Sequence, residues 1–527
     1  MLSYRKLAMR VLGRPLHTGG GGIDSPRPAS QRAAAFILTA AMLTTLTAPA
    51  FAKTWDIEKG DITVKAGEAE GPNKVKQGDS DFVKDEGDTI ITGTSDKNTV
   101  TIETEKKGDK VEVTLKDVNI EATGGKAAVS VTGKGDTNIE LDGDNKLSGS
   151  GAHAALEHNQ TVDSEKNVTS GKLTIQDDND KAGSLTATGG IQNGAGIGAG
   201  GYRVSSGKIE ITGGDITAVG GKSAAGIGGS GYRGNADITI SGGTIRATGG
   251  DQAAGIGGGG LYGSGNITIT GDAVIEESIG GSSGAGAGNA TGGAGIGGGA
   301  GGYGTIVISG NAQVKNAVGK DGGAGIGGGV YGLGRVTIEG GTTVNATGGL
   351  SAAGIGGGYG AENDEDDGIG NKIIIRNTKD GIPDITATGG DSKLNYAGIY
   401  IPGGAGIGSG AGDGSTEGVS LADADITIEG TINIVAKGGK DNSAIGANGI
   451  EQEFNGLAEG SSITRCDSEG NDISLPGDKV PVTETSSGGG SSTPSAGGGS
   501  AGASVQESVF PGLVVTDKDG QRISYTS

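Results

Sequence analysis

Residues 236–260 read ADITISGGTIRATGGDQAAGIGGGG, and this stretch decides the fold. It contains three short segments in which apolar residues alternate with other residues, and glycines close each segment. Alternation with a period of two is typical of β-strands, and paired glycines are typical of turns. The closing phrase around Ile256 recurs eight times from Ile197 to Ile445, most often at intervals of 29 or 30 residues. A repeat of this length predicts a solenoid.

The repeat predicts an all-β chain that forms a right-handed parallel β-helix, with three short strands per coil of about 30 residues. Paired glycines are expected at the corners, where the backbone turns with positive φ. Equivalent residues then stack from coil to coil at about 4.8 Å. The competing architecture is a β-propeller, whose blades need about 40 residues and longer strands. In residues 236–260 the expected inward side chains are Ile238, Ile240, Ile245, Ala247, Ala254 and Ile256.

Changes of composition along the chain predict seven regions. They are a signal peptide (1–52), an N-terminal cap or first coils (53–98), β-helix coils (99–182), glycine-rich repeats (183–450), a C-terminal cap (451–482), a Gly/Ser linker (483–508) and a tail or the start of a truncated module (509–527). Basic residues precede the apolar run 33–43, and Ala50-Phe51-Ala52 fits a cleavage site after Ala52. This run is too short for a membrane anchor, so we expect a secreted or cell-surface protein with no membrane insertion after signal removal.

The charge balance of the chain is acidic, with 41 basic and 62 acidic side chains. Removal of residues 1–52 takes away six basic residues and one acidic residue, so the net charge falls from −21 to −26. Such a surface disfavours nucleic acid and anionic membranes as partners. The single cysteine, Cys466, cannot form an internal disulfide, so we interpret it as an incidental thiol. The sequence does not indicate an oligomeric state.

A tyrosine follows the glycine run of six successive repeats. These residues are Tyr202, Tyr232, Tyr262, Tyr303, Tyr331 and Tyr359. At one corner of a regular β-helix they would form a ladder with a spacing of about 4.8 Å, close to the length of one sugar unit. Their rings present an apolar body and a polar tip, which suits sugars, so we predict a carbohydrate-binding platform. A buried structural stack at the corner would give the same pattern, and both interpretations remain open.

Glycine also occupies the expected outward positions of the third segment, as at Gly255 and Gly257. The outer face of this segment is therefore predicted to expose nearly bare backbone. Outward glycine is expected where another group approaches closely. That group is a ligand chain lying flat, a covering loop, or the backbone itself in a tight curve.

Acidic clusters are candidate calcium sites, because calcium binds several carboxylate and carbonyl oxygens. The candidate ligands are Asp177, Asp178, Asp180, Asp364, Asp366 and Asp367. Solvated acidic loops have the same composition. Calcium is the one cofactor that the sequence suggests.

The sequence gives little support for catalysis. The predicted mature chain has only two histidines, His153 and His158, and no nucleophile motif. Carboxylates from different coils could form a pair, but the sequence does not identify one. We therefore assign no catalytic residue, and the enzymatic status of the chain stays open.

The Ala-Gly-Ile-Gly repeats, together with Val113–Ile120, Gly171–Ile175 and Leu185–Gly190, resemble secreted bacterial carbohydrate-binding domain proteins of the pectin-lyase-like β-helix fold. The resemblance covers approximately residues 95–450. It implies binding of acidic plant polysaccharides such as polygalacturonate, with calcium and without lyase activity, and it transfers no ligand residue. We therefore expect a non-catalytic extracellular polysaccharide-binding protein. A structural adhesin or stalk and a polysaccharide lyase or hydrolase are the alternatives.

Overall fold

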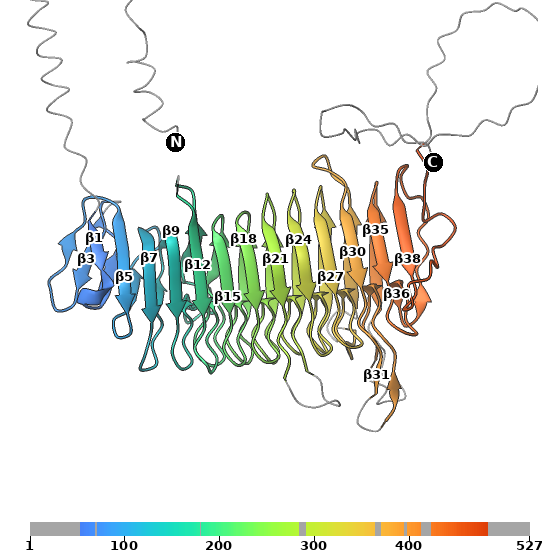
Figure 1. Cartoon of the computed structure of the whole chain (residues 1–527), viewed down its shortest axis with the longest axis horizontal. Coiled ribbons are helices and arrows are strands. Elements are labelled where there is room, and N and C mark those ends of the chain that lie inside the picture. Colours follow the sequence, from blue (N-terminus) through green and yellow to red (C-terminus); the bar gives the residue numbers. More distant parts are fainter. Residues whose placement is uncertain are drawn as a thin grey trace, which may run out of the picture. The chain divides into compact units, whose positions relative to one another are not determined.

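The computed structural model describes residues 53–68, 71–179, 181–283, 291–363, 370–394, 398–412 and 423–482. These residues belong to one compact unit that ends at Val482, and they form a row of parallel strands (Figure 1). They contain 38 strands, one short 3₁₀-helix, η1 (Ile57–Lys59), and no α-helix. None of their helical segments is long and apolar enough to cross a bilayer. The predicted signal peptide, linker and tail lie outside the described residues.

Each coil contributes one strand to each of three faces, as β17 (Ala236–Ile240), β18 (Thr244–Thr248) and β19 (Ile256–Gly257) show. Every one of these strands pairs in parallel with its counterpart in the next coil. On the third face Ile256 pairs with Ile296, 40 residues on, because the loop between them holds an insertion. The chain is therefore a right-handed parallel β-helix with three strands per coil, as predicted.

Three sets of strands build the faces, and the first two sets join in one continuous sheet. The first set after the N-terminal coils is β11 (Lys172–Gln176), β14 (Lys208–Ile211), β17, β20 (Gly265–Ile269), β23 (Gly304–Ile308), β26 (Gly334–Glu339), β29 (Asn371–Arg376) and β34 (Ala424–Glu429). The second set is β12 (Gly183–Thr188), β15 (Asp215–Val219), β18, β21 (Val274–Ile279), β24 (Gln313–Val318), β27 (Thr343–Thr347), β30 (Asp384–Thr388), β35 (Asn433–Lys437) and β38 (Ser462–Cys466). The third set is β2 (Ile62–Lys65), β6 (Val100–Thr104), β8 (Val129–Gly133), β10 (Leu156–Glu157), β13 (Ile197–Gly198), β16 (Ile227–Gly228), β19, β22 (Ile296–Gly297), β25 (Ile326–Gly327), β28 (Ile355–Gly356), β33 (Ile407–Gly408) and β36 (Ile445–Ala447).

The N-terminal coils use longer strands that run through the first and second faces together. They are β5 (Thr89–Ser95), β7 (Lys110–Glu121) and β9 (Asp136–Ser148), and β1 (Thr54–Asp56) pairs with β5. The register of β7 against β9 shifts next to Asp117, where φ is 51°. Later coils replace this bend by paired glycines, as at Gly243, where φ is 81°. The predicted positive φ is thus confirmed at the corner between the first and second strands.

The paired glycines between the second and third strands of a coil are required for a different reason. Gly249 and Gly250 are not in the positive-φ region, so the expected turn geometry is wrong there. A methyl group on Gly250 would lie only 1.7 Å from the carbonyl oxygen of Gly221 in the preceding coil. Glycine is required at this corner because the backbones of successive coils touch.

The core is a column of small and branched apolar side chains that runs from Trp55 to Ile463. All six side chains predicted to point inward in residues 236–260 are buried. The hydrophobic effect contributes about 1.5–3 kcal/mol for each fully buried isoleucine. Repetition of this contribution along the solenoid stabilises a fold that has only 3% aromatic residues.

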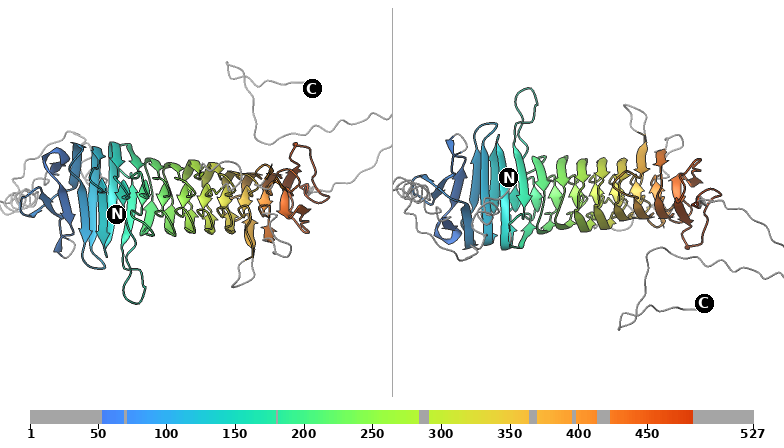
Figure 2. Two further views of the ribbon diagram at one scale, coloured as in Figure 1. Left: turned by 90° about the horizontal axis from the view of Figure 1, so that it is seen from below. Right: turned by 90° about the horizontal axis from the view of Figure 1, so that it is seen from above.

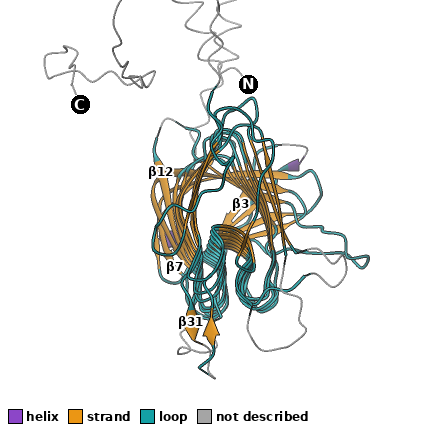
Figure 3. Ribbon diagram, turned by 90° about the vertical axis from the view of Figure 1, so that its right-hand side faces the viewer, coloured by secondary structure: helices purple, strands orange, loops and turns teal. Residues whose placement is uncertain are grey.

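The prediction that the outer side of the third face exposes bare backbone is wrong. Gly255 and Gly257 are buried, as are the equivalent glycines of the other repeats. At Gly257, where φ is 135°, a methyl group would lie 2.0 Å from the carbonyl oxygen of Gly297. The group that approaches these glycines is therefore the neighbouring coil. Figure 3 shows how the loops of successive coils stack below the ring of strands.

Antiparallel strands and polar contacts close the N-terminal end. β3 (Lys74–Gln77) pairs antiparallel with β2, and β4 (Val83–Lys84) pairs with β3. The indole N–H of Trp55 donates a buried hydrogen bond of 2.8 Å to Asp85. A closed end of this kind prevents the sheet from pairing with another chain.

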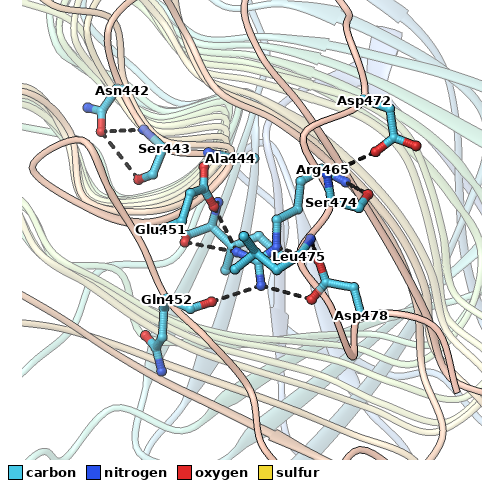
Figure 4. A network of polar contacts seen from close by, with 11 residues as sticks. Asn442, Ser443, Ala444, Glu451, Gln452, Arg465, Asp472, Ser474, Leu475 and Asp478 are labelled. Carbon is cyan, nitrogen blue, oxygen red and sulfur yellow. Dashed lines mark hydrogen bonds and ion pairs between the residues drawn. The ribbon is translucent and has the colours of Figure 1, made fainter.

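At the C-terminal end, β37 (Ile450–Glu451) turns back on β36, and Arg465 of β38 takes the inward position that Ala436 holds one coil earlier. Arg465 is fully buried and lies 2.8 Å from Asp478 and 2.7 Å from Glu451. It also donates to the carbonyl oxygen of Gln452 (Figure 4). A buried cation with satisfied hydrogen bonds thus ends the apolar column.

Two segments project from the solenoid. The first is the hairpin 159–170, the narrow teal loop in Figure 2, whose base pairs with the loop around Ser206. The second consists of β31 (Lys393–Leu394) and β32 (Tyr400–Ile401), which pair antiparallel below the third face. Both insertions enlarge loops and leave the register of the strands unchanged.

The glycine contact at the third face gives a stability prediction. Gly257→Ala should lower the free energy of unfolding by about 2 kcal/mol or more, because alanine is strained at this φ and its methyl group meets the carbonyl oxygen of Gly297. Thr248→Ala, at a partly exposed strand position, is the control and should change it by about 0.5 kcal/mol or less. Urea unfolding followed by circular dichroism measures both, and equal stability of the two variants would contradict the packing argument.

The buried arginine gives a second prediction. Arg465→Met should cost about 3–5 kcal/mol, because it leaves two carboxylates without their cation. The same substitution at Arg376, whose ion pair with Glu339 is partly exposed, should cost about 1 kcal/mol or less. Thermal and urea unfolding of the two variants test the difference, and a similar loss at both positions would show that Arg465 is not a critical part of the cap.

Candidate functional site

The six predicted tyrosines follow the third strand in successive repeats, but they do not form one ladder. Cross-coil hydrogen bonds align Tyr232, Leu261, Ala300, Val330 and Tyr359 in one column. The next column contains Tyr262, Gly301, Tyr331 and Gly360. Tyr202 pairs with Gly231, and Tyr303 is aligned with Leu333 in a third position. The prediction of a single ladder is therefore wrong, because the tyrosines occupy different positions along the coil.

Three tyrosines of consecutive coils nevertheless touch one another. The rings of Tyr202 and Tyr232 stack with centroids 5.6 Å apart, and the ring of Tyr262 meets Tyr232 edge-on at 6.2 Å. Tyr202 is 60% exposed and Tyr262 is 53% exposed, whereas Tyr232 is half-buried between them. We call these three residues, with Arg203 and Arg233, the tyrosine corner.

Each arginine of the tyrosine corner lies beside two of the rings. The guanidinium of Arg203 lies 4.5 Å from the ring centroid of Tyr232 and 5.5 Å from that of Tyr202. Arg233 is 5.9 Å from Tyr232 and 5.5 Å from Tyr262. These distances are within the range of cation–π attraction. The corner therefore combines tyrosine rings with guanidinium groups.

The backbone of the tyrosine corner adopts a conformation that favours glycine. φ is 63° at Arg203, 56° at Tyr232, 64° at Arg233 and 69° at Tyr262. In the coil after Tyr262, glycine takes this conformation in the same column, at Gly301, where φ is 72°. Bulky residues with positive φ are uncommon, and strained residues of this kind cluster at functional sites.

The remaining tyrosines have different environments. Tyr331 is 49% exposed and its ring lies 6.0 Å from that of Tyr359. Tyr359 is buried in a small cluster with Val330 and Ile401, so it cannot belong to an exposed platform. Tyr303 is 37% exposed at the start of the following first strand. The distance from the repeat isoleucine to the tyrosine varies from four to seven residues, but it does not assign the columns, because Tyr202, Tyr232 and Tyr331 share a distance of five and lie in three different columns.

Lys393 covers the buried ring of Tyr359. Its ammonium lies 3.4 Å from the ring centroid and is buried without a hydrogen-bond partner among the described residues. Burial lowers the pKa of Lys393 to about 8, although the charge of Asp321 acts in the opposite direction. The contact between the titratable ammonium of Lys393 and the ring of Tyr359 thus holds the hairpin of β31 and β32 against the solenoid.

The predicted calcium ligands that are described do not form a cation site. Asp177 accepts a hydrogen bond from the backbone N–H of Gly183, and the backbone N–H of Asp178 donates to Glu140. No group of three or more His, Cys, Asp or Glu side chains in the described part of the chain is arranged to hold a metal ion. The other four candidates, Asp180, Asp364, Asp366 and Asp367, lie outside the described residues.

Sequence reasoning missed a groove of about 450 Å³ near the N-terminal end, lined by Glu140, Asp142, Asp178 and Lys181 among others. Burial raises the pKa of Glu140, and the neighbouring Asp178 raises it further. Burial also opposes ionisation of Asp142, but hydrogen bonds to Lys181 and Lys116 hold the pKa of this carboxyl below its usual value. Two carboxyls with opposite shifts are suited to acid–base chemistry. The alternation of β9 places both carboxyls on one side of the strand, whereas Asp178 and Lys181, which shift their pKa values, come from the next coil.

The two histidines of the described chain have separate roles. His158 is buried, with its ring nitrogens near the carbonyl oxygens of Val131 and Gly171, and burial lowers its pKa. It therefore fills the interior of a coil. His153 lies 2.8 Å from Glu157 and is partly exposed.

The fold and the tyrosine corner define the chain as a parallel β-helix protein with an exposed aromatic and basic strip. Its coils at residues 209–232, 238–260 and 336–359 match the family described as Beta helix repeat. Two of these matches end at one of the six repeat tyrosines, Tyr232 and Tyr359. No curated protein and no solved structure matches the chain. The repeat family favours a polysaccharide-related or structural extracellular role and specifies no ligand.

The titration of Lys393 gives a testable pH dependence. The unfolded amine has a pKa near 10.5 and the folded one about 8, so the unfolded state binds more protons between these values. The contribution of Lys393 to the free energy of unfolding should therefore increase as the pH rises from about 8 towards 10.5. Urea unfolding at several pH values should show this gain in the wild-type protein, and Lys393→Met should abolish it. Parallel pH profiles for the two proteins would rule out the contact.

Proposed function

We propose that this protein is a non-catalytic extracellular polysaccharide-binding protein, and that the tyrosine corner holds an acidic polysaccharide. The observation that carries the proposal is the run of tyrosine and arginine residues with positive φ in consecutive coils. Each such residue costs about 1–3 kcal/mol relative to a relaxed backbone. Glycine takes this conformation at Gly301 and Leu261 takes it with a φ of 47°, so the support for a binding role comes from the exposed rings and guanidinium groups that the strained backbone presents.

The chemistry of the corner supports an anionic ligand. Arg203 and Arg233 lie beside the rings, in a protein whose net charge is −21, so they concentrate positive charge where most of the surface repels anions. Guanidinium groups bind carboxylates through paired, charge-assisted hydrogen bonds. Uronic acid residues provide one carboxylate per sugar, which fits the repeat of one corner per coil.

The geometry of the rings refines the predicted platform. Because Tyr202 and Tyr232 stack on each other, each covers one ring face of the other. A chain that runs along the solenoid would contact ring edges, phenol hydroxyls and guanidinium groups there, and Tyr262, turned by 81°, would provide an apolar contact. The proposed binding mode therefore combines hydrogen bonds and charge with one exposed aromatic contact.

In this proposal, calcium binds only together with the polysaccharide ligand. The described residues provide no preformed cation site, so any calcium dependence would come from ions that bridge the acidic polysaccharide to surface carboxylates. Export by the predicted signal peptide belongs to the same proposal, because a polysaccharide ligand of this class lies outside the cell. Addition of EDTA to the binding assay tests the contribution of calcium.

One observation favours a second candidate function, a polysaccharide hydrolase or lyase. Glu140 and Asp142 lie two residues apart on β9, line one groove and have opposite pKa shifts. Two carboxyls, one with a raised and one with a lowered pKa, are the groups that bond cleavage in sugars uses. Release of new chain ends from polygalacturonate, lost in Glu140→Gln, would establish this function.

The tyrosine corner predicts the effect of two substitutions on binding. Tyr232→Ala and Tyr262→Ala should each weaken retention in a polygalacturonate affinity gel by about two- to tenfold, because each removes an aromatic contact worth about 0.5–1.5 kcal/mol. Arg233→Gln should weaken retention and reduce its dependence on salt, because it removes a charge.

Tyr303→Ala is the matched control, because Tyr303 is an exposed tyrosine in a different column and its loss should leave retention unchanged. Equal retention of the wild-type protein and the Tyr232→Ala and Tyr262→Ala variants would refute the proposed site. A protein that no acidic polysaccharide retains would instead favour a structural adhesin or stalk.

A further inference from the structure

The outer side of the third face differs between the two halves of the solenoid. In the N-terminal coils it forms a groove of about 360 Å³ across β2, β6, β8 and β10. The strand register places Thr63, Thr101, Ser130 and Glu157 in one outward row, with one residue per coil. The next residue of this row is Gly198, where the glycine-rich repeats begin. The row thus passes from hydroxyls to a carboxylate and then to glycine.

The change to glycine decides where the groove ends. From Gly198 onwards the outward positions of the third face are buried against the carbonyl oxygens of adjacent coils. Gly200 lies so close to Glu157 that a methyl group there would be 1.8 Å from the carboxylate. The N-terminal part of the face lacks this filling, so its polar side chains line a space of ligand size.

The hydroxyl groups of the row are available to a ligand. Thr63, Thr101 and Ser130 are partly exposed, and their hydroxyls form no hydrogen bond with any described residue. A hydroxyl can donate one hydrogen bond and accept two. Successive coils are about 4.8 Å apart, so the row repeats at a distance close to the length of one sugar unit.

His153, which is hydrogen-bonded to the buried carboxylate of Glu157, lies at the end of the groove where the glycine-rich repeats begin. Glu157 is 7% exposed and accepts hydrogen bonds from the backbone N–H of Ala154 at 3.1 Å and from Asn159 at 3.1 Å. Its third partner is Nδ1 of His153, at 2.8 Å. Within the described residues Nε2 of His153 has no hydrogen-bond partner, and the ring lines the groove. The carboxylate therefore orients the imidazole so that Nε2 can bind a ligand hydroxyl.

The charges around the groove compensate each other. Asp61 caps the backbone N–H of Thr99 at 2.7 Å and lies 3.9 Å from the ammonium of Lys126. Glu157 is satisfied by three donors, one of them His153. No excess of positive charge would favour a polyanion, in contrast to the tyrosine corner. What remains is a row of donors and acceptors in a groove whose lining contains no Phe, Tyr or Trp.

We propose that this groove is a second glycan-binding site, and that it takes an uncharged, hydroxyl-rich polysaccharide chain lying along the row from Thr63 to His153. The site is separate from the tyrosine corner in sequence and in charge. It therefore goes beyond the proposed function and does not depend on it. A protein with both sites would link an acidic chain to a neutral one.

The test uses the full chain in affinity gels that contain galactan, arabinan or mixed-linkage β-glucan as neutral probes, and polygalacturonate as the acidic probe. At least one neutral probe should retain the wild-type protein. Thr63→Val with Thr101→Val, which keeps the β-branched shape but removes both hydroxyls, should weaken that retention at least tenfold. His153→Ala should weaken it similarly, and neither variant should change retention by polygalacturonate.

Thr239→Val is the matched control, because Thr239 is a partly exposed outward threonine of β17, outside the groove. Unfolding curves that coincide with that of the wild-type protein show that the variants are folded, and Ser130→Ala replaces any variant that is not. The proposal is overturned if none of the three neutral probes retains the protein, if the groove variants bind like Thr239→Val, or if Tyr232→Ala abolishes neutral binding instead. Loss of polygalacturonate retention in the tyrosine variants alone concerns only the tyrosine corner.

Discussion

The close contact between the backbones of successive coils is the constraint on which the rest of this structure depends. Carbonyl oxygens of one coil lie against the α-carbons of the previous coil, as Gly297 does against Gly257. Any side chain at such a position would push the coils apart, so glycine is required wherever the loops stack. The same close stacking places isoleucine on isoleucine in the core, and 115 glycines are its compositional mark. Low-complexity composition is here a consequence of dense packing.

The charged and aromatic side chains with distinctive roles lie at positions where the sequence departs from the repeat. Among the described residues, arginine takes an inward position where the column ends, at Arg465, and there two carboxylates and a backbone carbonyl satisfy it. Tyrosine and arginine replace glycine in strained backbone at the tyrosine corner. Glu157 replaces glycine at the boundary between the open and the filled part of the third face. Each departure carries a local free-energy penalty, which the uniform core offsets.

A regular scaffold of this kind separates function from stability. Strand register keeps outward side chains in rows at a fixed spacing, and a substitution in a row leaves the core unchanged. Two surfaces of opposite character, the cationic and aromatic tyrosine corner and the hydroxyl-rich row of the third face, can therefore coexist on one solenoid. Loops between strands accept insertions, such as the hairpin of β31 and β32, without a change of register.

The sequence alone determined the architecture, because the alternation of apolar residues and the interval of the Ile-Gly phrase are local signals that the core simply repeats. All six predicted inward residues of the quoted coil are buried, and the tyrosines do follow the third strand. Contacts between coils decided the rest. A difference of one residue in the distance from the repeat isoleucine separates exposed Tyr331 from buried Tyr359. The filled third face, the groove ending at His153 and the opposite pKa shifts of Glu140 and Asp142 depend on residues one or more coils away. Only the tertiary register brings these residues together, because no local pattern encodes what the neighbouring coil places beside them.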